Sequence, residues 1–198
     1  MKKARLALVL AAAALGGNAE AALQARDLNG DTVVDAFYDT DLDITWRRNG
    51  NVNGLMTWGQ AVNWAANSTF GGYTDWRLPT SDACAGFDCT GSELGHLWYS
   101  ELGNIAGDPT PDLGGFANVQ LYAYWSGTPY APDPTQAWHF NIDLGDQDFA
   151  AKPSLLFAIA VRPGDVVAVI PEPETYALML AGLGALGVVA RRRKARTG

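Results

Sequence analysis

The end of the chain, from Pro171 onward, constrains its fold most, because three parts of different composition follow one another there without a gap. A Pro171-Glu172-Pro173 element comes first, an uncharged apolar run from 175 to 190 follows, and a basic cluster closes it with Arg191, Arg192, Arg193 and Lys194. The prolines keep the first part extended, and the basic residues hold the far end of an inserted helix on the cytoplasmic side of a membrane. A buried C-terminal helix is less favoured, because apolar side chains occupy every face.

The apolar run is short for a permanent membrane anchor. As a helix it would measure about 24 Å, against a hydrocarbon core of about 30 Å. The three parts in this order resemble the PEP-CTERM sorting signal of Gram-negative bacteria. The resemblance implies that exosortase, a membrane peptidase, cleaves near the PEP element, with Pro171, Glu172, Pro173 and Arg191, Arg192, Arg193 carrying the sorting signal. We therefore expect a precursor that stays only transiently in the inner membrane and is then passed to the cell surface or the extracellular matrix.

The N-terminus has the features of a secretory signal peptide. Lys2, Lys3 and Arg5 precede a short apolar segment, and the small-x-small pattern at 19–21 predicts cleavage between Ala21 and Ala22 after export by the Sec machinery. The expected organisation is a signal peptide at 1–21, one domain at 22–165, a linker with the PEP motif at 166–174, and a hydrophobic helix with a basic tail at 175–198.

The part between the two membrane-directed ends is strongly acidic. Residues 22–170 hold 6 basic and 18 acidic side chains, a net charge of −12. Such a domain gains nothing from counterion release on a phosphate backbone, so nucleic acid is a poor partner. Divalent cations, cationic surfaces and neutral glycans remain open, beside the plain interpretation of a solubilising surface.

Cys84 and Cys89 are the two cysteines of the chain. Export implies an oxidising compartment, so we expect a local disulfide that contributes roughly 2 kcal/mol. A redox role is disfavoured, because the spacing is not Cys-x-x-Cys. A zinc site formed by both cysteines with His96 and His139 is disfavoured by irregular spacing.

An acidic stretch opens the domain. Asp27, Asn29, Asp31 and Asp35 fall at positions 1, 3, 5 and 9 of an EF-hand-like loop, which makes calcium the one cofactor that the sequence suggests. Thr32 stands where that loop needs glycine, and Tyr38 where it needs glutamate. The favoured alternative is an Asx-rich turn before a strand.

Two amphipathic helices are expected, along with several short strands. A capping box at 57–60 starts the first helix, whose apolar face holds Trp58, Ala61, Val62 and Ala65. A second begins at the box 90–93 and ends at Gly103, with His96 in it as an ordinary polar residue. Strands are expected near 33–34, 44–46, 121–126, 136–144, 147–151 and 155–162, the last of them buried. In 71–80, Asp75 and Arg77 can pair with each other or bind backbone groups.

The strings GYTDWRLPT (72–80), YWSGT (124–128) and AVRPG (160–164) resemble the Lcl C-terminal domain, an exported bacterial domain of unknown function. That domain is grouped with C-type-lectin-like and formylglycine-generating-enzyme-like folds. The resemblance implies an α+β fold with two helices, a small, mostly antiparallel sheet and long loops. It runs from about 33 to 165. The chain departs from the pattern by inserting the loop with Cys84 and Cys89 before the second helix.

No motif of a known enzyme class is visible, so the sequence favours a binding module. Lectin-like folds present ligands on long loops, here 104–119 and 128–135. Aromatic side chains can stack on sugars while carboxylates bind hydroxyl groups or calcium. The candidates for binding a glycan or exopolysaccharide are Asp112, Tyr130, Asp133 and Trp138. A purely structural displayed module is the alternative, and a hydrolase is less favoured.

Overall fold

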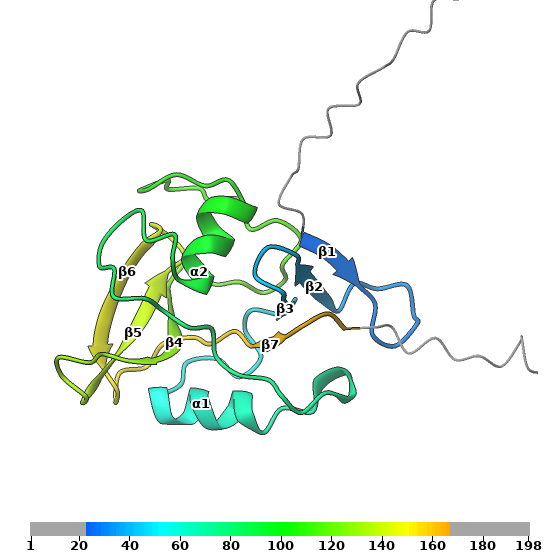
Figure 1. Cartoon of the computed structure of the whole chain (residues 1–198), viewed down its shortest axis with the longest axis horizontal. Coiled ribbons are helices and arrows are strands. Elements are labelled where there is room, and N and C mark those ends of the chain that lie inside the picture. The colour runs from blue at the N-terminus through cyan, green and yellow to red at the C-terminus, as the bar shows by residue number, and fades with distance from the viewer. Residues whose placement is uncertain (1–22, 167–198) are drawn as a thin grey trace, which may run out of the picture.

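A computed structural model describes residues 23–166 and forms two small antiparallel sheets with helices packed around them. Figure 1 shows α1 (Trp58–Ala66) and α2 (Glu93–Gly95) on opposite sides of the strands at the centre of the molecule. The fold is α+β, as expected, but two sheets replace the single one. The expected signal peptide, PEP linker and C-terminal hydrophobic helix lie outside the described residues.

The first sheet has the strand order β1-β2-β3-β7. Its strands are β1 (Leu23–Arg26), β2 (Ala36–Asp39), β3 (Ile44–Arg47) and β7 (Val161–Pro163), and all neighbouring pairs are antiparallel. The sequence predicted the β2–β3 pair but placed its first strand at 33–34, too early. The short apolar pair at 33–34 was the misleading signal, because it lies in the loop between β1 and β2.

The second sheet has the order β4-β5-β6. It is built from β4 (Ala123–Pro129), β5 (Gln136–Asn141) and β6 (Asp146–Ala151). The β5–β6 hairpin was predicted, and Gly145 stands in its turn with a φ of 82°. A backbone irregularity between Trp125 and Pro129 shifts the register of β4 against β5.

The segment from 155 to 163 links the two sheets. It bridges Met56 through Leu156, runs beside Tyr124 through Phe157, and ends as β7 beside β3. Its buried residues alternate between two core clusters. Ala158 and Ala160 join the cluster beneath α1, whereas Ile159 and Val161 join the cluster beneath α2. The predicted buried segment is confirmed, although only 161–163 has the pairing of a regular strand.

Helix α1 forms as its sequence predicts. Thr57 accepts a hydrogen bond from the Gln60 backbone N–H, and the Gln60 side chain accepts one from the Thr57 N–H at 2.9 Å. Ala61 and Ala65 are fully buried, with Trp58 and Val62 packed against the same cluster. The apolar stripe therefore faces the core, and the cap satisfies amides that the helix itself leaves free.

Residues 72–80 hold the start of the second helix in place through hydrogen bonds to its first turn. Arg77 makes two 2.7 Å bonds to the carboxylate of Glu93, which also accepts the Thr80 N–H at 2.7 Å. Asp75 instead pairs with Arg162 at 2.8 Å, so Asp75 and Arg77 each bind a distant partner rather than each other. The cap is Ser92, two residues later than the predicted start of the capping box.

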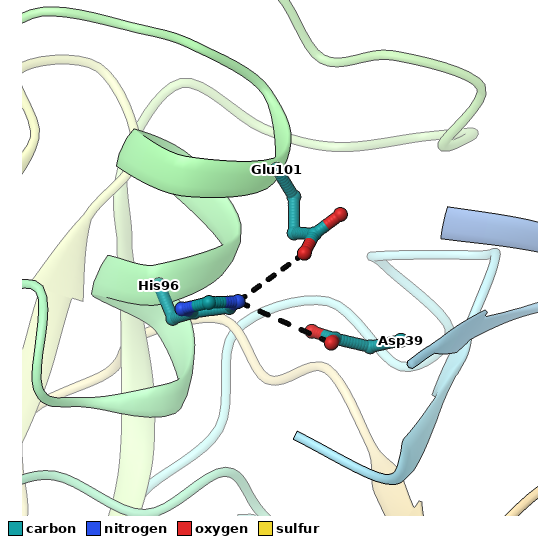
Figure 2. A group of neighbouring side chains, drawn as sticks. All are labelled: Asp39, His96 and Glu101. Carbon is teal, nitrogen blue, oxygen red and sulfur yellow. Dashed lines mark hydrogen bonds and ion pairs between the residues drawn. The ribbon is translucent and has the colours of Figure 1, made fainter. Parts of the chain in front are cut away.

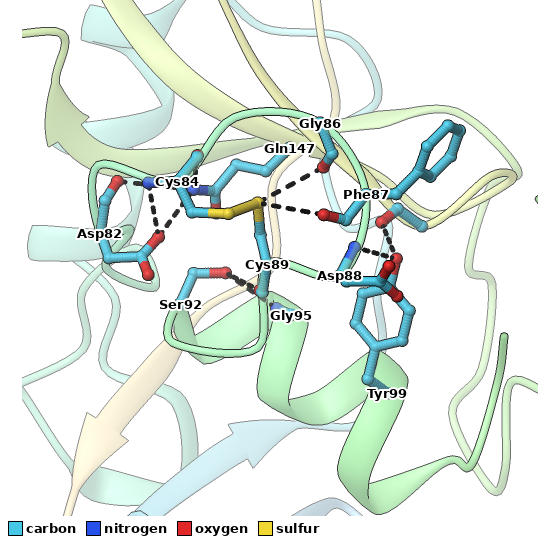
Figure 3. Close-up of a disulfide and its surroundings, with 11 residues drawn as sticks. Asp82, Cys84, Gly86, Phe87, Asp88, Cys89, Ser92, Gly95, Tyr99 and Gln147 are labelled. Carbon is cyan, nitrogen blue, oxygen red and sulfur yellow. Dashed lines mark hydrogen bonds between the residues drawn. A yellow bond between two sulfur atoms is a disulfide. The ribbon is translucent and has the colours of Figure 1, made fainter. Parts of the chain in front are cut away.

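The disulfide between Cys84 and Cys89 is present and closes the inserted loop (Figure 3). Gln147 on β6 donates to the Cys84 carbonyl at 2.7 Å, which ties the loop to the second sheet. On the other side the loop packs so closely on α2 that a Cβ at Gly95 would overlap the Cys89 carbonyl oxygen. Both cysteines are consumed by the disulfide, so the zinc site that would have used them is excluded.

Candidate functional site

One histidine and two carboxylates meet between the second helix and the first sheet (Figure 2). His96 Nε2 lies 3.2 Å from Glu101 Oε1 and 4.0 Å from Asp39 Oδ1. The carboxylate side chains are fully buried, while the His96 side chain is 18% exposed. Two acidic groups with no solvent contact thus converge on one imidazole.

The local helix geometry places His96 and Glu101 on the same face. The helix continues from α2 as η2 (His96–Glu101), a π-helix in which the Leu102 N–H reaches the Leu97 carbonyl at 3.0 Å. In an α-helix, side chains five residues apart point about 140° away from each other. A π-helical turn closes over five residues instead, so these two side chains align. Short π-helical segments occur frequently at functional sites.

Asp39 is fixed in place by the turn between β2 and β3. Its Oδ1 accepts the N–H groups of Asp41 and Leu42 at 3.1 and 3.0 Å, and its Oδ2 faces the Trp46 indole N–H at 3.4 Å. These donors hold the carboxylate at the end of β2 and aim it at His96. A carboxylate offers about four lone pairs over its two oxygens, so Asp39 retains capacity for a further partner, chiefly on Oδ2, whose one contact is long.

Glu101 is in an unfavourable electrostatic position for its charged form. Burial raises its pKa, the negative charge of Asp39 adds to this effect, and the hydrogen bond from His96 opposes it. Its Oε2 atom is buried and has no hydrogen-bond partner among the described residues. The site therefore contains more acceptor capacity and more negative charge than the protein groups around it satisfy.

Three of the four predicted glycan-binding residues lie together at the β4–β5 turn. Tyr130 stacks on Phe149 with ring centres 3.9 Å apart, and Trp138 meets both rings edge-on. This aromatic trio belongs to none of the three core clusters. Trp138 is only 5% exposed and packs as the buried member of the trio, whereas Tyr130 and Phe149 are partly exposed.

The two predicted carboxylates lie at opposite ends of the second sheet. Asp133 shapes the β4–β5 turn, where hydrogen bonds from Gln136 and Thr135 lower its pKa. Asp112 belongs to the loop whose Gly107 N–H binds the Leu144 carbonyl at the β5–β6 turn. The structure thus places Asp133 near Tyr130 and Trp138, and separates Asp112 from them.

The acidic stretch near the start of the domain forms a loop of Asx turns. Asp27 accepts three backbone N–H groups, from Asn29, Gly30 and Thr32, and Asn29 and Asp31 each accept one from two residues ahead. Asp35 accepts the Leu28 N–H at 3.0 Å. The four side chains therefore organise the loop backbone.

Sequence reasoning placed His96 in the second helix but gave it no role. The missed signal was the His-x4-Glu spacing, which pairs two side chains only if the helix widens into a π-turn. Asp39 is more than fifty residues away in sequence, and only the packing of the helix against β2 brings it to His96.

Comparison with known families shows which family the domain resembles. Residues 35–162 match the sequence profile of the Lcl C-terminal domain. The chain belongs to the Lcl C-terminal domain family. This match covers β2 through the start of β7, which includes both sheets apart from β1, both helices and all three residues of the His96 cluster. No curated protein matches the chain.

The Lcl domain is followed by a second match, since residues 169–194 fit the PEP-CTERM protein-sorting motif. The protein is therefore exported, and its membrane-anchored precursor is processed by exosortase for surface display. The sorting residues Pro171 to Pro173 and Arg191 to Arg193 fall within this match but lie outside the described residues, as does the signal cleavage at Ala21 and Ala22. Within residues 23–166, no helix is long and apolar enough to cross a membrane.

Proposed function

We propose that the displayed Lcl domain is a lectin-like binding module that holds a glycan or another surface component at the β4–β5 turn. The observation that carries the proposal is the stacked pair of Tyr130 and Phe149 beside Asp133, outside the main cores. Partly exposed aromatic rings present a flat apolar face to a sugar, and a neighbouring carboxylate can accept hydrogen bonds from its hydroxyl groups.

The charge of the domain narrows the ligand class. With a net charge of −12 over residues 22–170, the domain repels acidic polymers at low ionic strength. A neutral or amino-bearing glycan, such as an exopolysaccharide of the matrix, meets no such repulsion. Calcium at Asp27, Asn29, Asp31 and Asp35 is part of the proposal as a stabiliser of the loop, since carboxylate and amide oxygens are its usual ligands.

The test compares two tyrosine variants in protein recovered from the cell surface. Tyr130→Leu keeps an apolar side chain but removes the stacking face, whereas Tyr122→Leu makes the same change at an exposed tyrosine away from the turn. We expect Tyr130→Leu to weaken binding on a glycan array by about tenfold, about 1.4 kcal/mol, with Tyr122→Leu unchanged. Arrays are run with calcium and with a chelator.

Two outcomes contradict the proposal. Equal binding by both variants would move the ligand away from the β4–β5 turn. Arrays that stay blank for the unaltered protein, with and without calcium, would leave the alternative of a structural module that is displayed without a specific ligand.

A further inference from the structure

We infer that Asp39, His96 and Glu101 bind a divalent transition-metal ion, with Zn²⁺ as the best match. One ligand atom from each residue lies within 4.8 Å of the other two. An imidazole nitrogen with two carboxylate oxygens is a donor set that zinc accepts, whereas calcium and magnesium prefer oxygen alone. The site is distinct from the aromatic trio and from the acidic loop at 27–35.

Charge is the first argument. The side chains of Asp39 and Glu101 are fully buried and face the same point, and a buried carboxylate keeps its charge only when it is paired with a cation or coordinates a metal. Within residues 23–166, neither carboxylate has an ion pair with an arginine or lysine. Protonated His96 would balance one of the two charges. A divalent ion balances both and leaves His96 neutral, which is the form that binds metal.

Unsatisfied bonding capacity is the second argument. Glu101 Oε2 is buried without a partner in the part of the chain that the structure describes. A buried acceptor in that condition costs free energy, and a metal bound by both oxygens of Glu101 would remove the cost. The backbone amides that hold Asp39 serve as the outer layer of bonds that orients a ligating carboxylate.

Geometry is the third argument. Zinc bonds of about 2.0 Å in a tetrahedron place neighbouring ligand atoms about 3.3 Å apart. His96 Nε2 and Glu101 Oε1 are 3.2 Å apart, and Asp39 Oδ1 lies 4.0 Å from the same nitrogen. All three ligand atoms lie within 4.8 Å of one another, so a shift of the Asp39 carboxylate by about 1.5 Å or less brings three corners to bonding distance.

The test titrates the full-length chain, purified in detergent and stripped with a chelator, with ZnCl₂ by isothermal calorimetry. We expect one ion per chain, retained in an excess of Mg²⁺ or Ca²⁺. Co²⁺ should give the visible absorption of a tetrahedral site. His96→Gln and Glu101→Gln should each weaken zinc binding at least about 100-fold, since even residues behind metal ligands change affinity 10–100-fold.

His139→Phe and Asp108→Asn serve as matched controls, because they remove a histidine and a carboxylate elsewhere in the domain and should bind zinc normally. Circular dichroism establishes that each variant is folded. The inference is overturned if the folded, unaltered chain takes up no stoichiometric zinc, or if both His96→Gln and Glu101→Gln bind it as tightly as the controls do. An imidazolium at His96 that persists at neutral pH in the presence of zinc, seen by NMR, would also overturn it.

Discussion

At the scale of single residues, the two histidines of the chain have different surroundings. His96 faces two buried carboxylates. His139 on β5 is 9% exposed, packs edge-on against Trp125, and has a buried Nδ1 without a partner in the described part of the chain. Burial lowers the pKa of His139, and the nearby charges of Asp148 and Asp146 offset this only in part. His139 is therefore neutral in the folded protein at pH 7.

This neutral histidine makes stability depend on pH. Unfolding exposes His139 and restores its ordinary pKa of about 6.5, so below that pH the unfolded chain binds a proton that the folded one resists. The free energy of unfolding should fall as the pH drops from 7 toward the lowered pKa of the folded state.

Urea titrations of the unaltered chain and of His139→Phe, at a series of pH values, check this prediction. Phenylalanine keeps a ring against Trp125 but cannot titrate. The difference in the free energy of unfolding between the two proteins therefore separates the effect of His139 from that of the other titratable groups. A stability difference that stays constant between pH 7 and 5 would contradict the prediction.

At the scale of elements, local signals specified the helices better than the strands. The capping box at Thr57 and the apolar stripes of both helices are encoded within one or two turns of chain, and the structure confirms them. Strand positions depend on partners distant in sequence. The segment 155–163 could be recognised as buried but not as the link between two sheets, because its contacts run to Met56, Tyr124 and β3.

The candidate site shows the same limit. Tyr130, Asp133 and Trp138 come together because they belong to one hairpin, whereas Asp112 lies at the other end of the sheet. His96 and Glu101 share a face through a π-turn that helical periodicity does not anticipate, and Asp39 joins them only through tertiary packing.

The clamp between Arg77 and Glu93 gives a prediction at this scale. Glu93→Ala removes three hydrogen bonds, two from Arg77 and one from the Thr80 N–H, at the first turn of the second helix. We expect a loss of about 2 kcal/mol in the free energy of unfolding, because bonds to a charged group contribute more than neutral ones.

Chemical denaturation measures this loss, with Asp108→Ala as the comparison. Asp108 is also an acidic residue, but its side-chain bonds stay within its own loop, at Thr110, so its removal should change stability by about 0.5 kcal/mol or less. Equal losses in the two variants would show that the clamp does not anchor the helix.

At the scale of the whole molecule, two parts of the chain have separate tasks. The match at 169–194 directs the protein to exosortase, and the Lcl domain remains on the displayed product. Folding of the domain and recognition of the tail should therefore be separable by mutation.

Intact-mass analysis of membrane and surface fractions tests this separation. Glu172→Ala, or replacement of Arg191, Arg192 and Arg193 by glutamine, should leave most of the protein as unprocessed precursor in the inner membrane, because the first removes the charged centre of the PEP element and the second removes the cytoplasmic positive charge. Glu174→Ala, just outside the PEP element, should be processed normally. Normal release of either sorting variant would contradict the assignment of the tail.

The end of the domain limits the distance between the folded part of the precursor and the PEP element. Arg26 binds Asp165 at 2.7 Å and Val166 is fully buried, so the folded body extends to within five residues of Pro171. Five residues reach at most about 17 Å even when fully extended. Pro171 therefore lies within about 17 Å of Val166 whatever path the chain takes. The β4–β5 turn lies at the far end of the molecule from β1 (Figure 1), so the domain's last described residue, Val166, and the proposed binding turn are on different sides of the folded body.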